Sequence, residues 1–178
     1  MFIETERLIL RKFQDSDFDD YCEYAMNDEM NRMMGNVYMR DKETARINFD
    51  WLMNKADRCY GLVLKDTGKL IGNLSIGKVS SELAEMDILK GKDGRSLSYC
   101  VSWHFQRRGL MYETLTAVID ELFSNEGLDY IYCGYFSFNT PSEILQKKLG
   151  FEYLTTSHFE INGESVTAIE NVLWNNRK

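Results

Sequence analysis

The chain has 178 residues, of which 44% are hydrophobic and 13% aromatic; this suits one folded domain with its own core and argues against intrinsic disorder. The formal net charge of −7 is the reverse of the basic surface that nucleic-acid-binding proteins usually carry. No apolar run approaches the ~20 residues that cross a bilayer, and the N-terminus lacks the basic segment and apolar core of a signal peptide.

Cysteine and histidine usage bears on redox state and metal binding. The four cysteines are widely spaced and form no Cys-x-x-Cys pair: Cys22, Cys59, Cys100 and Cys133. Reduced thiols in a cytoplasmic protein are therefore expected, rather than disulfides or a zinc site. Because His104 and His158 are the only histidines, a histidine-based centre is poorly supplied and we expect no bound metal.

The N-terminal half predicts a strand, two helices and a hairpin. Residues 3–13 interleave Ile and Leu with charges, as strands do, and the acidic start of 14–30 favours a helix. A second helix is expected from about Asp41 to Asn54, with Ile47, Trp51 and Leu52 at helical spacing. Two apolar runs around the turn 66–68 predict a β-hairpin, and a charged loop with one short helical turn follows up to residue 95.

The next segment predicts a strand, a helix and a further strand. Residues 96–103 are expected to place Leu97, Tyr99 and Val101 on one face. The helix that follows ends near Gly127 and carries one apolar stripe: Met111, Leu115, Val118, Ile119, Leu122 and Phe123. Residues 129–136 are typical of a buried strand.

Residues 140–150 carry the best-marked helix signals. Thr140 is expected as N-cap, Pro141 as first helical residue and Glu143 as the partner in a capping box. Lys147 and Lys148 fall in the last turn, and Gly150 closes the helix. Strands at about 151–160 and 164–173 follow, with the turn at 162–163 (Asn-Gly). This order of elements predicts a single α/β domain over residues 1–178.

The junction at the start of the helix after residue 106 has the composition of an anion site. Adjacent Arg107 and Arg108 precede Gly109. A helix N-terminus exposes unpaired N–H groups and partial positive charge, so a phosphate there accepts several hydrogen bonds. Gly109 has no Cβ to hinder close approach. Paired arginines at a helix start also occur as ordinary surface residues, and neither nucleotide-binding glycine signature is present.

The whole pattern resembles the GCN5-related N-acetyltransferase (GNAT) superfamily. The resemblance rests on a strand, QRRGLM (106–111), a helix, a strand, and N-x-x-S (139–142) before LGF (149–151). TERLILR (5–11) and KLIGNLSIG (69–77) resemble its ribosomal-protein N-terminal acetyltransferase (Rim-type) branch. It implies an α/β fold with a mixed, mostly antiparallel sheet of about seven strands and about four helices, with a splayed parallel strand pair at the cofactor site.

The same resemblance implies the chemistry. The protein would move an acetyl group directly from acetyl-CoA to a primary amine: a peptide N-terminus, an amino acid, a polyamine or an amino sugar. It would be a cytoplasmic monomer or homodimer, with neither nucleic acid nor membrane as partner. A non-catalytic acyl-CoA-binding or regulatory protein on the same fold is the alternative.

The resemblance also implies which residues hold coenzyme A. In the family a Q/R-x-x-G-x-G/A loop wraps the pyrophosphate with backbone amides. Its counterpart here is Gln106, Arg107, Arg108, Gly109, Leu110 and Met111, followed by Tyr112. Met111 replaces a small residue, and either turns into the helix stripe or alters how closely the cofactor approaches. The strand residues Tyr99, Cys100 and Val101 would pair with the pantetheine arm, and the Val101 amide would polarise the thioester carbonyl.

Acetyl transfer to an amine needs a neutral amine, a stabilised oxyanion and a proton for the departing thiolate. Many relatives use a tyrosine where this chain has Gln146; the Rim-type branch has a serine three residues after an asparagine, here Ser142 and Asn139. Asn139 would bind the cofactor arm or the acceptor backbone. Ser142, which would also contact the cofactor, either protonates the thiolate or fills a helix first turn. Glu160, His158 or water is the candidate base; for Glu160 the alternative is a solvent-facing residue, as most exposed glutamates are.

Acidic residues gather in the N-terminal helical region and in the loop at 80–94. In the resemblance these regions border the acceptor entrance, so their negative field would draw in a cationic amine. The alternative interpretation is that these acidic residues only form solvated helix and loop faces. The residues are Asp15, Asp17, Asp19, Asp20, Glu23, Glu82, Glu85 and Asp87.

Overall fold

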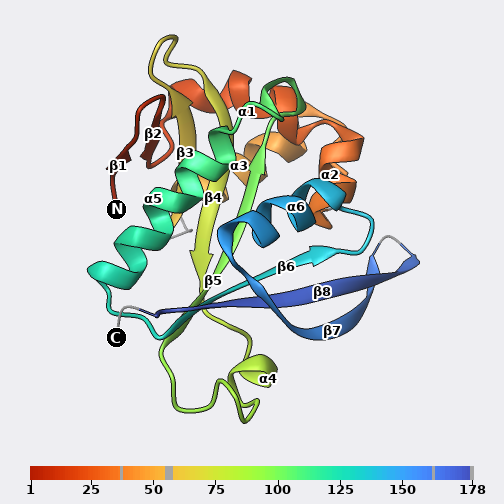
Figure 1. Ribbon diagram of the computed structural model, residues 1–178. Coiled ribbons are helices and arrows are strands. Elements are labelled where there is room, and N and C mark those ends of the chain that lie inside the picture. The colour runs from red at the N-terminus through yellow and green to blue at the C-terminus, as the bar shows by residue number, and fades with distance from the viewer. Residues whose placement is uncertain (37, 55–57, 162, 177–178) are drawn as a thin grey trace. The chain divides into compact units, whose positions relative to one another are not determined.

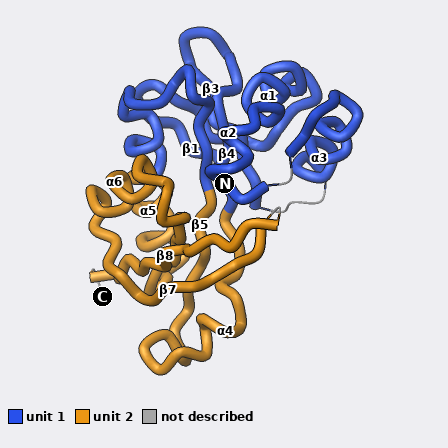
Figure 2. Tube along the Cα trace, turned by 90° about the vertical axis from the view of Figure 1, so that its right-hand side faces the viewer, with its two compact units in different colours: residues 1–75, 99–115 blue, residues 76–98, 116–178 orange. Residues whose placement is uncertain are grey.

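The structure is a computed structural model that describes residues 1–36, 38–54, 58–161 and 163–176. The chain divides into two compact units (Figure 2): residues 1–75 with 99–115, and residues 76–98 with 116–178. A single domain over 1–178 stays a prediction. Within the described ranges, no helix combines the length and apolarity that a membrane span requires.

The strands belong to one mixed sheet with the order β1-β2-β3-β4-β5-β6-β8-β7. They are β1 (Ile3–Glu4), β2 (Leu8–Arg11), β3 (Cys59–Leu64), β4 (Leu70–Gly77), β5 (Gly94–Val101), β6 (Tyr130–Phe136), β7 (Glu152–Ile161) and β8 (Glu164–Trp174). The pairs β1–β2, β2–β3, β3–β4, β6–β8 and β7–β8 are antiparallel. β5 pairs with β6 in parallel, from Gly94 opposite Tyr130 to Ser96 opposite Tyr132. The predicted α/β class with its parallel pair is confirmed, and the splay of that pair stays a prediction.

The sheet has eight strands because residues 3–13 form two strands instead of the predicted one. Thr5 makes the turn between them: its N–H donates to Leu8 O at 2.9 Å, and its Oγ1 accepts from Leu8 N at 3.1 Å. The polar side chain therefore folds β1 back onto β2, with Ile3 opposite Leu10.

The described residues contain six α-helices (Figure 1). They are α1 (Phe18–Ala25), α2 (Asp28–Met34), α3 (Lys42–Asn54), α4 (Ser81–Ala84), α5 (Leu110–Ser124) and α6 (Thr140–Leu149). The single helix predicted for residues 14–30 is broken at Asn27, because the Asn27 side chain accepts a hydrogen bond from Met30 N and caps α2. The helical turn expected in the loop before β5 is α4.

In the first unit, α1, α2 and α3 pack with β3 and β4 around a cluster of aromatic rings. The Phe49 ring on α3 lies 5.6 Å from the Phe13 ring, 5.4 Å from Phe18 and 5.2 Å from Tyr21, between ring centroids. Such edge-on and tilted contacts add to the free energy of burial. The rings fix which face of α3 is inside.

Helix α3 is present as predicted, but two of the three apolar residues that have helical spacing in the sequence do not face the core. Ile47 and Trp51 are 68% and 55% exposed. The helical period is right, but the sequence offers a second stripe at the same spacing, and the aromatic cluster selects it. The buried members are Ala45, Phe49 and Leu52.

The second unit has a buried cluster of Leu89, Tyr130 and Val172. The α5 stripe, which begins in the first unit and continues in the second, is confirmed in full. Its members are all buried: Met111, Leu115, Val118, Ile119, Leu122 and Phe123. Gly127, just beyond α5, has φ 66°, and the predicted hairpin turn before β4 contains Gly68 with φ 71°.

The N-cap of α6 is Asn139, one residue before the predicted Thr140. Asn139 Oδ1 accepts a hydrogen bond from Ser142 N at 3.2 Å, so the reach of the amide side chain places the cap. Glu143 accepts from Lys147 Nζ at 2.6 Å, in an i,i+4 pair and not in a capping box. Gly150 ends the helix with φ 87°, as predicted. Asn162, predicted for the β7–β8 turn, lies outside the described residues.

Candidate coenzyme A and catalytic sites

The connection from β5 to α5, in the first unit, carries the predicted pyrophosphate loop. Ser102 N donates to Ile71 O at 2.7 Å and fastens the end of β5 to β4. A single 3₁₀ turn, Trp103–Phe105, follows, and α5 begins at Leu110. Residues 106–109 therefore form a short loop at a helix N-terminus, where backbone N–H groups lack helical partners.

The backbone of this loop has a positive φ at two positions. Arg107 has φ 60° and Gly109 has φ 75°. Arg107 is the single non-glycine residue with positive φ among those described, and this conformation costs a side-chain-bearing residue about 1 kcal/mol. The two positive φ values turn the backbone sharply between the extended Gln106 (φ −65°, ψ 163°) and the start of α5, where backbone N–H groups lack helical partners.

The two arginines of the loop are placed differently. Arg108 Nη2 donates to His104 O at 2.9 Å, and its guanidinium lies 5.1 Å from the centre of the Phe105 ring, so its charge is held against its own loop. Arg107 is exposed, and none of the described residues forms an ion pair with it. Arg107 and the loop amides, rather than the Arg108 side chain, are thus the better placed groups for an anion.

The remaining loop residues contribute backbone and packing. Gln106 Nε2 lies 3.4 Å from Val101 O and 3.6 Å from Met30 Sδ, which ties the loop to the end of β5. Leu110 and Met111 are 4% and 6% exposed. Met111 therefore turns into the helix stripe, the first of the two outcomes considered. Tyr112 is half-buried.

The β5 residues predicted to meet the pantetheine arm lie tightly against β4. A Cβ at Gly72 would fall 2.2 Å from Cys100 O, so a glycine is required there. The Cys100 thiol is buried and donates to Asn73 Oδ1 at 3.0 Å; burial raises its pKa to about 12. A thiol with this pKa is protonated at neutral pH, and so Cys100 is no nucleophile.

The second unit brings Asn139, Ser142 and Gln146 together. Besides the Asn139 cap, Gln146 Nε2 donates to Ser142 Oγ at 3.2 Å and lies 3.3 Å from Gly134 O. Because a peptide carbonyl can only accept, the amide nitrogen must be the group on this side. Asn171 Nδ2 donates to Gln146 Oε1 at 2.8 Å. Gln146, 1% exposed, therefore holds the Ser142 hydroxyl oxygen, and Asn171 is a member of this network that the sequence did not reveal.

The candidate bases Glu160 and His158 are both exposed on β7. Glu160 lies opposite Ser165 in the β7–β8 register, and His158 Nδ1 lies 3.2 Å from Thr167 Oγ1. The second unit also contains a carboxylate that sequence reasoning missed, Glu170 on β8, which is 2% exposed.

Glu170 is held by a tyrosine and accommodated by a glycine. It accepts a hydrogen bond from Tyr132 Oη, and burial, with this hydrogen bond second, raises the pKa of Tyr132. A Cβ at Gly134 would lie 2.3 Å from Glu170 Oε2, so the glycine leaves room for the carboxylate. Strand alternation with Ala168 and Val172 is the signal that could have placed Glu170 inside.

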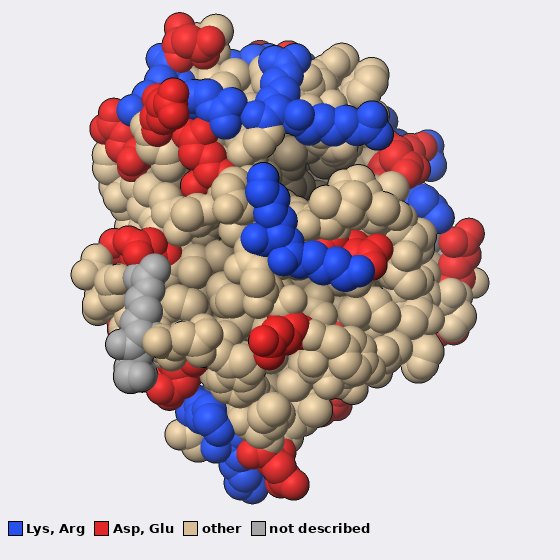
Figure 3. Space-filling view, viewed as in Figure 1, with Lys and Arg blue, Asp and Glu red and all other residues tan. Residues whose placement is uncertain are grey.

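The acidic residues of the N-terminal helical region are neutralised locally. Five of them, Asp15, Asp17, Asp19, Asp20 and Glu23, pair with four cations: Arg46, Arg11, Lys42 and Lys69. Figure 3 shows acidic and basic side chains interspersed on the face in view. Paired charges of both signs leave little net electric field at a distance. This favours the interpretation that these acidic residues form solvated helix faces, and not that they attract a cationic acceptor.

Comparison with known proteins decides the family. Residues 7–152 match the family model described as the acetyltransferase (GNAT) domain. The chain belongs to the GNAT acetyltransferase family. The predicted resemblance is thereby confirmed, and the protein is an N-acetyltransferase of this family. GNAT proteins use acetyl-CoA, and the amides of residues 107–110 with the exposed Arg107 fit its pyrophosphate.

Relatives of this GNAT chain lie in several bacteria. It is 28% identical to uncharacterized N-acetyltransferase p20 of Bacillus licheniformis, over 83% of this chain and 80% of that protein. A GNAT-family acetyltransferase structure from Bacillus anthracis has a TM-score of 0.81 at 19% identity, covering 98% of this chain and 99% of that one. The ribosomal-protein-S5-alanine acetyltransferase of Vibrio fischeri has a TM-score of 0.74 at 18% identity, covering 99% and 97%. At these identities the structural likeness shows the fold.

Proposed function

We propose that this GNAT protein transfers an acetyl group directly from acetyl-CoA to a primary amine. The observation that carries the proposal is the β5–α5 loop, in which Arg107 and Gly109 take left-handed conformations at the N-terminus of α5. A strained arginine and a glycine at a helix N-terminus suit a dianion. Direct transfer is supported by Cys100, since a buried, protonated thiol forms no acetyl intermediate.

Acetyl-CoA would supply the activated thioester, and we assign the chain's residues the roles that the family resemblance implies. The backbone amides of the loop, with Arg107, would hold the pyrophosphate, and the backbone of Tyr99, Cys100 and Val101 would hold the arm. The N–H of Val101 would donate a hydrogen bond to the thioester carbonyl oxygen; one such donor typically contributes about 3 kcal/mol.

Ser142 is our candidate for the acid that protonates the departing thiolate. Its hydroxyl oxygen accepts from Gln146, which is supported from behind by Asn171, so the oxygen is fixed in place before the reaction. Asn139 holds the Ser142 backbone. Glu160 is the proposed base, with His158 or water as its alternatives.

A protein or peptide N-terminus is the first acceptor to test. The Vibrio fischeri neighbour is named for the alanine of ribosomal protein S5, and the resemblance of residues 5–11 to the Rim-type branch points the same way. Free amino acids, polyamines and amino sugars follow, because the residues described carry no feature that selects among primary amines.

The test combines binding with turnover. Calorimetry should detect acetyl-CoA binding to the folded protein, and a panel of these amines should release free thiol with at least one member. Absence of binding would overturn the proposal. Binding with no turnover on any amine would instead establish the non-catalytic acyl-CoA-binding alternative.

A further inference from the structure

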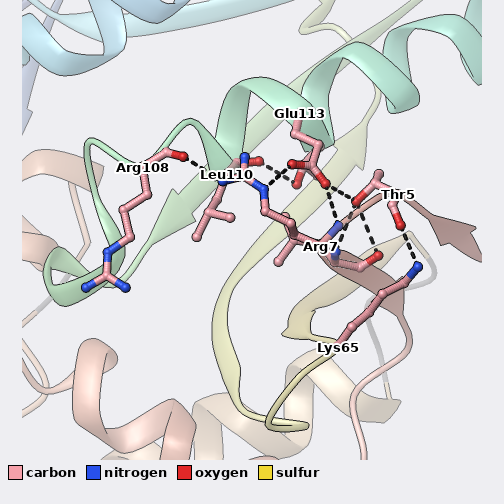
Figure 4. Close-up of polar contacts among 8 residues, drawn as sticks. Thr5, Arg7, Lys65, Arg108, Leu110 and Glu113 are labelled. Carbon is pink, nitrogen blue, oxygen red and sulfur yellow. Dashed lines mark hydrogen bonds and ion pairs between the residues drawn. The ribbon is translucent and has the colours of Figure 1, made fainter.

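Three side chains of the first unit, Thr5, Arg7 and Glu113, form a clasp between the β1–β2 turn and the first turns of α5 (Figure 4). Glu113 Oε1 accepts from Thr5 Oγ1 at 2.5 Å and from Arg7 N at 2.9 Å. Glu113 Oε2 accepts from Arg7 Nε at 2.7 Å. Arg7 also donates from Nη1 to Arg108 O at 3.0 Å, so one guanidinium joins the clasp to the pyrophosphate loop.

The contact with Arg108 O falls at the centre of the loop, between the two left-handed residues Arg107 and Gly109. A peptide unit is planar and trans, so its C=O and the following N–H point in opposite directions. When Arg7 holds the Arg108 carbonyl on one side, the Gly109 N–H is directed to the other. Arg7 therefore sets the orientation of an amide at the place where a phosphate would bind.

Arg7 also offsets the negative charge of Glu113 near the N-terminus of α5. A carboxylate in the first turns of α5 competes for the positive end of the helix dipole and repels an anion placed there. Burial acts to raise the pKa of Glu113, but hydrogen bonds from Thr5 and Arg7 outweigh it and the pKa is lowered. Glu113 is thus ionised at neutral pH, and the Arg7 guanidinium offsets its charge beside the loop.

We propose that Arg7 is a positioning residue for coenzyme A: braced by Glu113, it holds the Arg108 carbonyl and so presents the Gly109 N–H to the pyrophosphate. The inference rests on the proposed function, because it requires the pyrophosphate at residues 106–112. It extends the binding site to a residue about a hundred positions away in the sequence, on the β1–β2 turn.

The variant Arg7→Lys tests the proposal. Lysine keeps a positive charge near Glu113, but a single ammonium lacks the fork that reaches Glu113 and Arg108 O together. The probes are acetyl-CoA and acetyl-pantetheine, which carries the same thioester without the pyrophosphate, each titrated by ligand-observed NMR. We expect acetyl-CoA to bind about ten-fold more weakly, as for loss of one charge-assisted hydrogen bond, and acetyl-pantetheine to bind as it does to the wild type.

Two further variants complete the design. Arg7→Gln keeps an amide donor without charge and should weaken acetyl-CoA binding more than Arg7→Lys. Arg40→Lys is the matched control, since Arg40 pairs with Asp28 at 3.2 Å on an exposed surface of the same unit, and it should bind both probes as the wild type does.

The outcomes distinguish a failure of the Arg7 proposal from a failure of the proposed function. Equal losses for both probes would make Arg7 a purely structural residue and overturn the inference, as would unchanged acetyl-CoA binding in both Arg7 variants. If the wild type binds acetyl-CoA no better than acetyl-pantetheine, the pyrophosphate site itself is wrong, and the proposed function loses its main support together with the inference.

Discussion

Replacing Gly109 by alanine separates the cost of backbone strain from the cost of blocking a phosphate. Gly109 has φ 75°, and a Cβ built there meets Arg7 Nη2 at 3.6 Å, an ordinary van der Waals contact. The added methyl group therefore clashes with nothing in the protein. Its cost to folding is the left-handed conformation alone, about 1 kcal/mol, which lowers the Tm of a chain of this length by about 2–4 °C.

The cost to binding is expected to be larger. If a phosphate lies against the Gly109 backbone, the methyl group occupies its approach and removes a hydrogen bond to a charged group, which contributes about 1.5–3 kcal/mol. Acetyl-CoA should then bind roughly 10- to 150-fold more weakly in calorimetry.

Gly68→Ala supplies the control in the same unit. Gly68 has φ 71° and open space around its Cβ position, so this variant carries the same strain in the β3–β4 turn. Both variants should lose the same Tm, while only Gly109→Ala loses affinity. Equal, undiminished acetyl-CoA binding by both folded variants would refute the reasoning.

Three further predictions concern turnover, salt and pH. Ser142→Ala should lower kcat about 10²–10⁴-fold and weaken acetyl-CoA binding much less. If the variant keeps the wild-type kcat when chemistry limits the rate, Ser142 is only a residue of the first helical turn. Because the acids of the N-terminal helical region are paired, kcat/KM for the best amine should change little between low and physiological salt, and a steep fall would restore the steering role. The pKa of Glu113 is lowered in the folded state, so its carboxylate stabilises the fold at pH values above its unfolded pKa of about 4.3. The higher Tm of the wild type relative to Glu113→Gln should therefore be lost as the pH falls through the folded-state pKa. A Tm difference that persists at still lower pH would contradict this.

Local patterns in the sequence were sufficient to predict most of the helices, strands and turns. The α5 stripe needs only a 3.6-residue period, and all its members are buried. The β3–β4 turn and the end of α6 need only a glycine at a left-handed position. The loop at 106–111 was found in the same way, because its arginines, its glycine and the helix that follows are adjacent in the chain.

Choices between equally good local patterns required the tertiary structure. Residues of α3 offer two stripes with the helical period, and the rings of Phe13, Phe18 and Tyr21 decide that Phe49 faces inward. Asn139 and Thr140 are both good N-caps, and the observed hydrogen bond to Ser142 N selects Asn139.

The contacts of the side chains around the candidate sites could not be predicted from the sequence, because the partners are far apart in the chain. Arg108 turns back onto its own loop, while Arg7, from a distant turn, holds the Arg108 carbonyl. Gln146 and Asn171 meet although 25 positions separate them, and Thr5 and Glu113 although 108 do. The sequence by itself was enough to predict an anion site at residues 106–111, because that prediction depends only on neighbours in the chain. The groups that contact and orient this loop were decided by the tertiary structure, because they come from distant parts of the sequence.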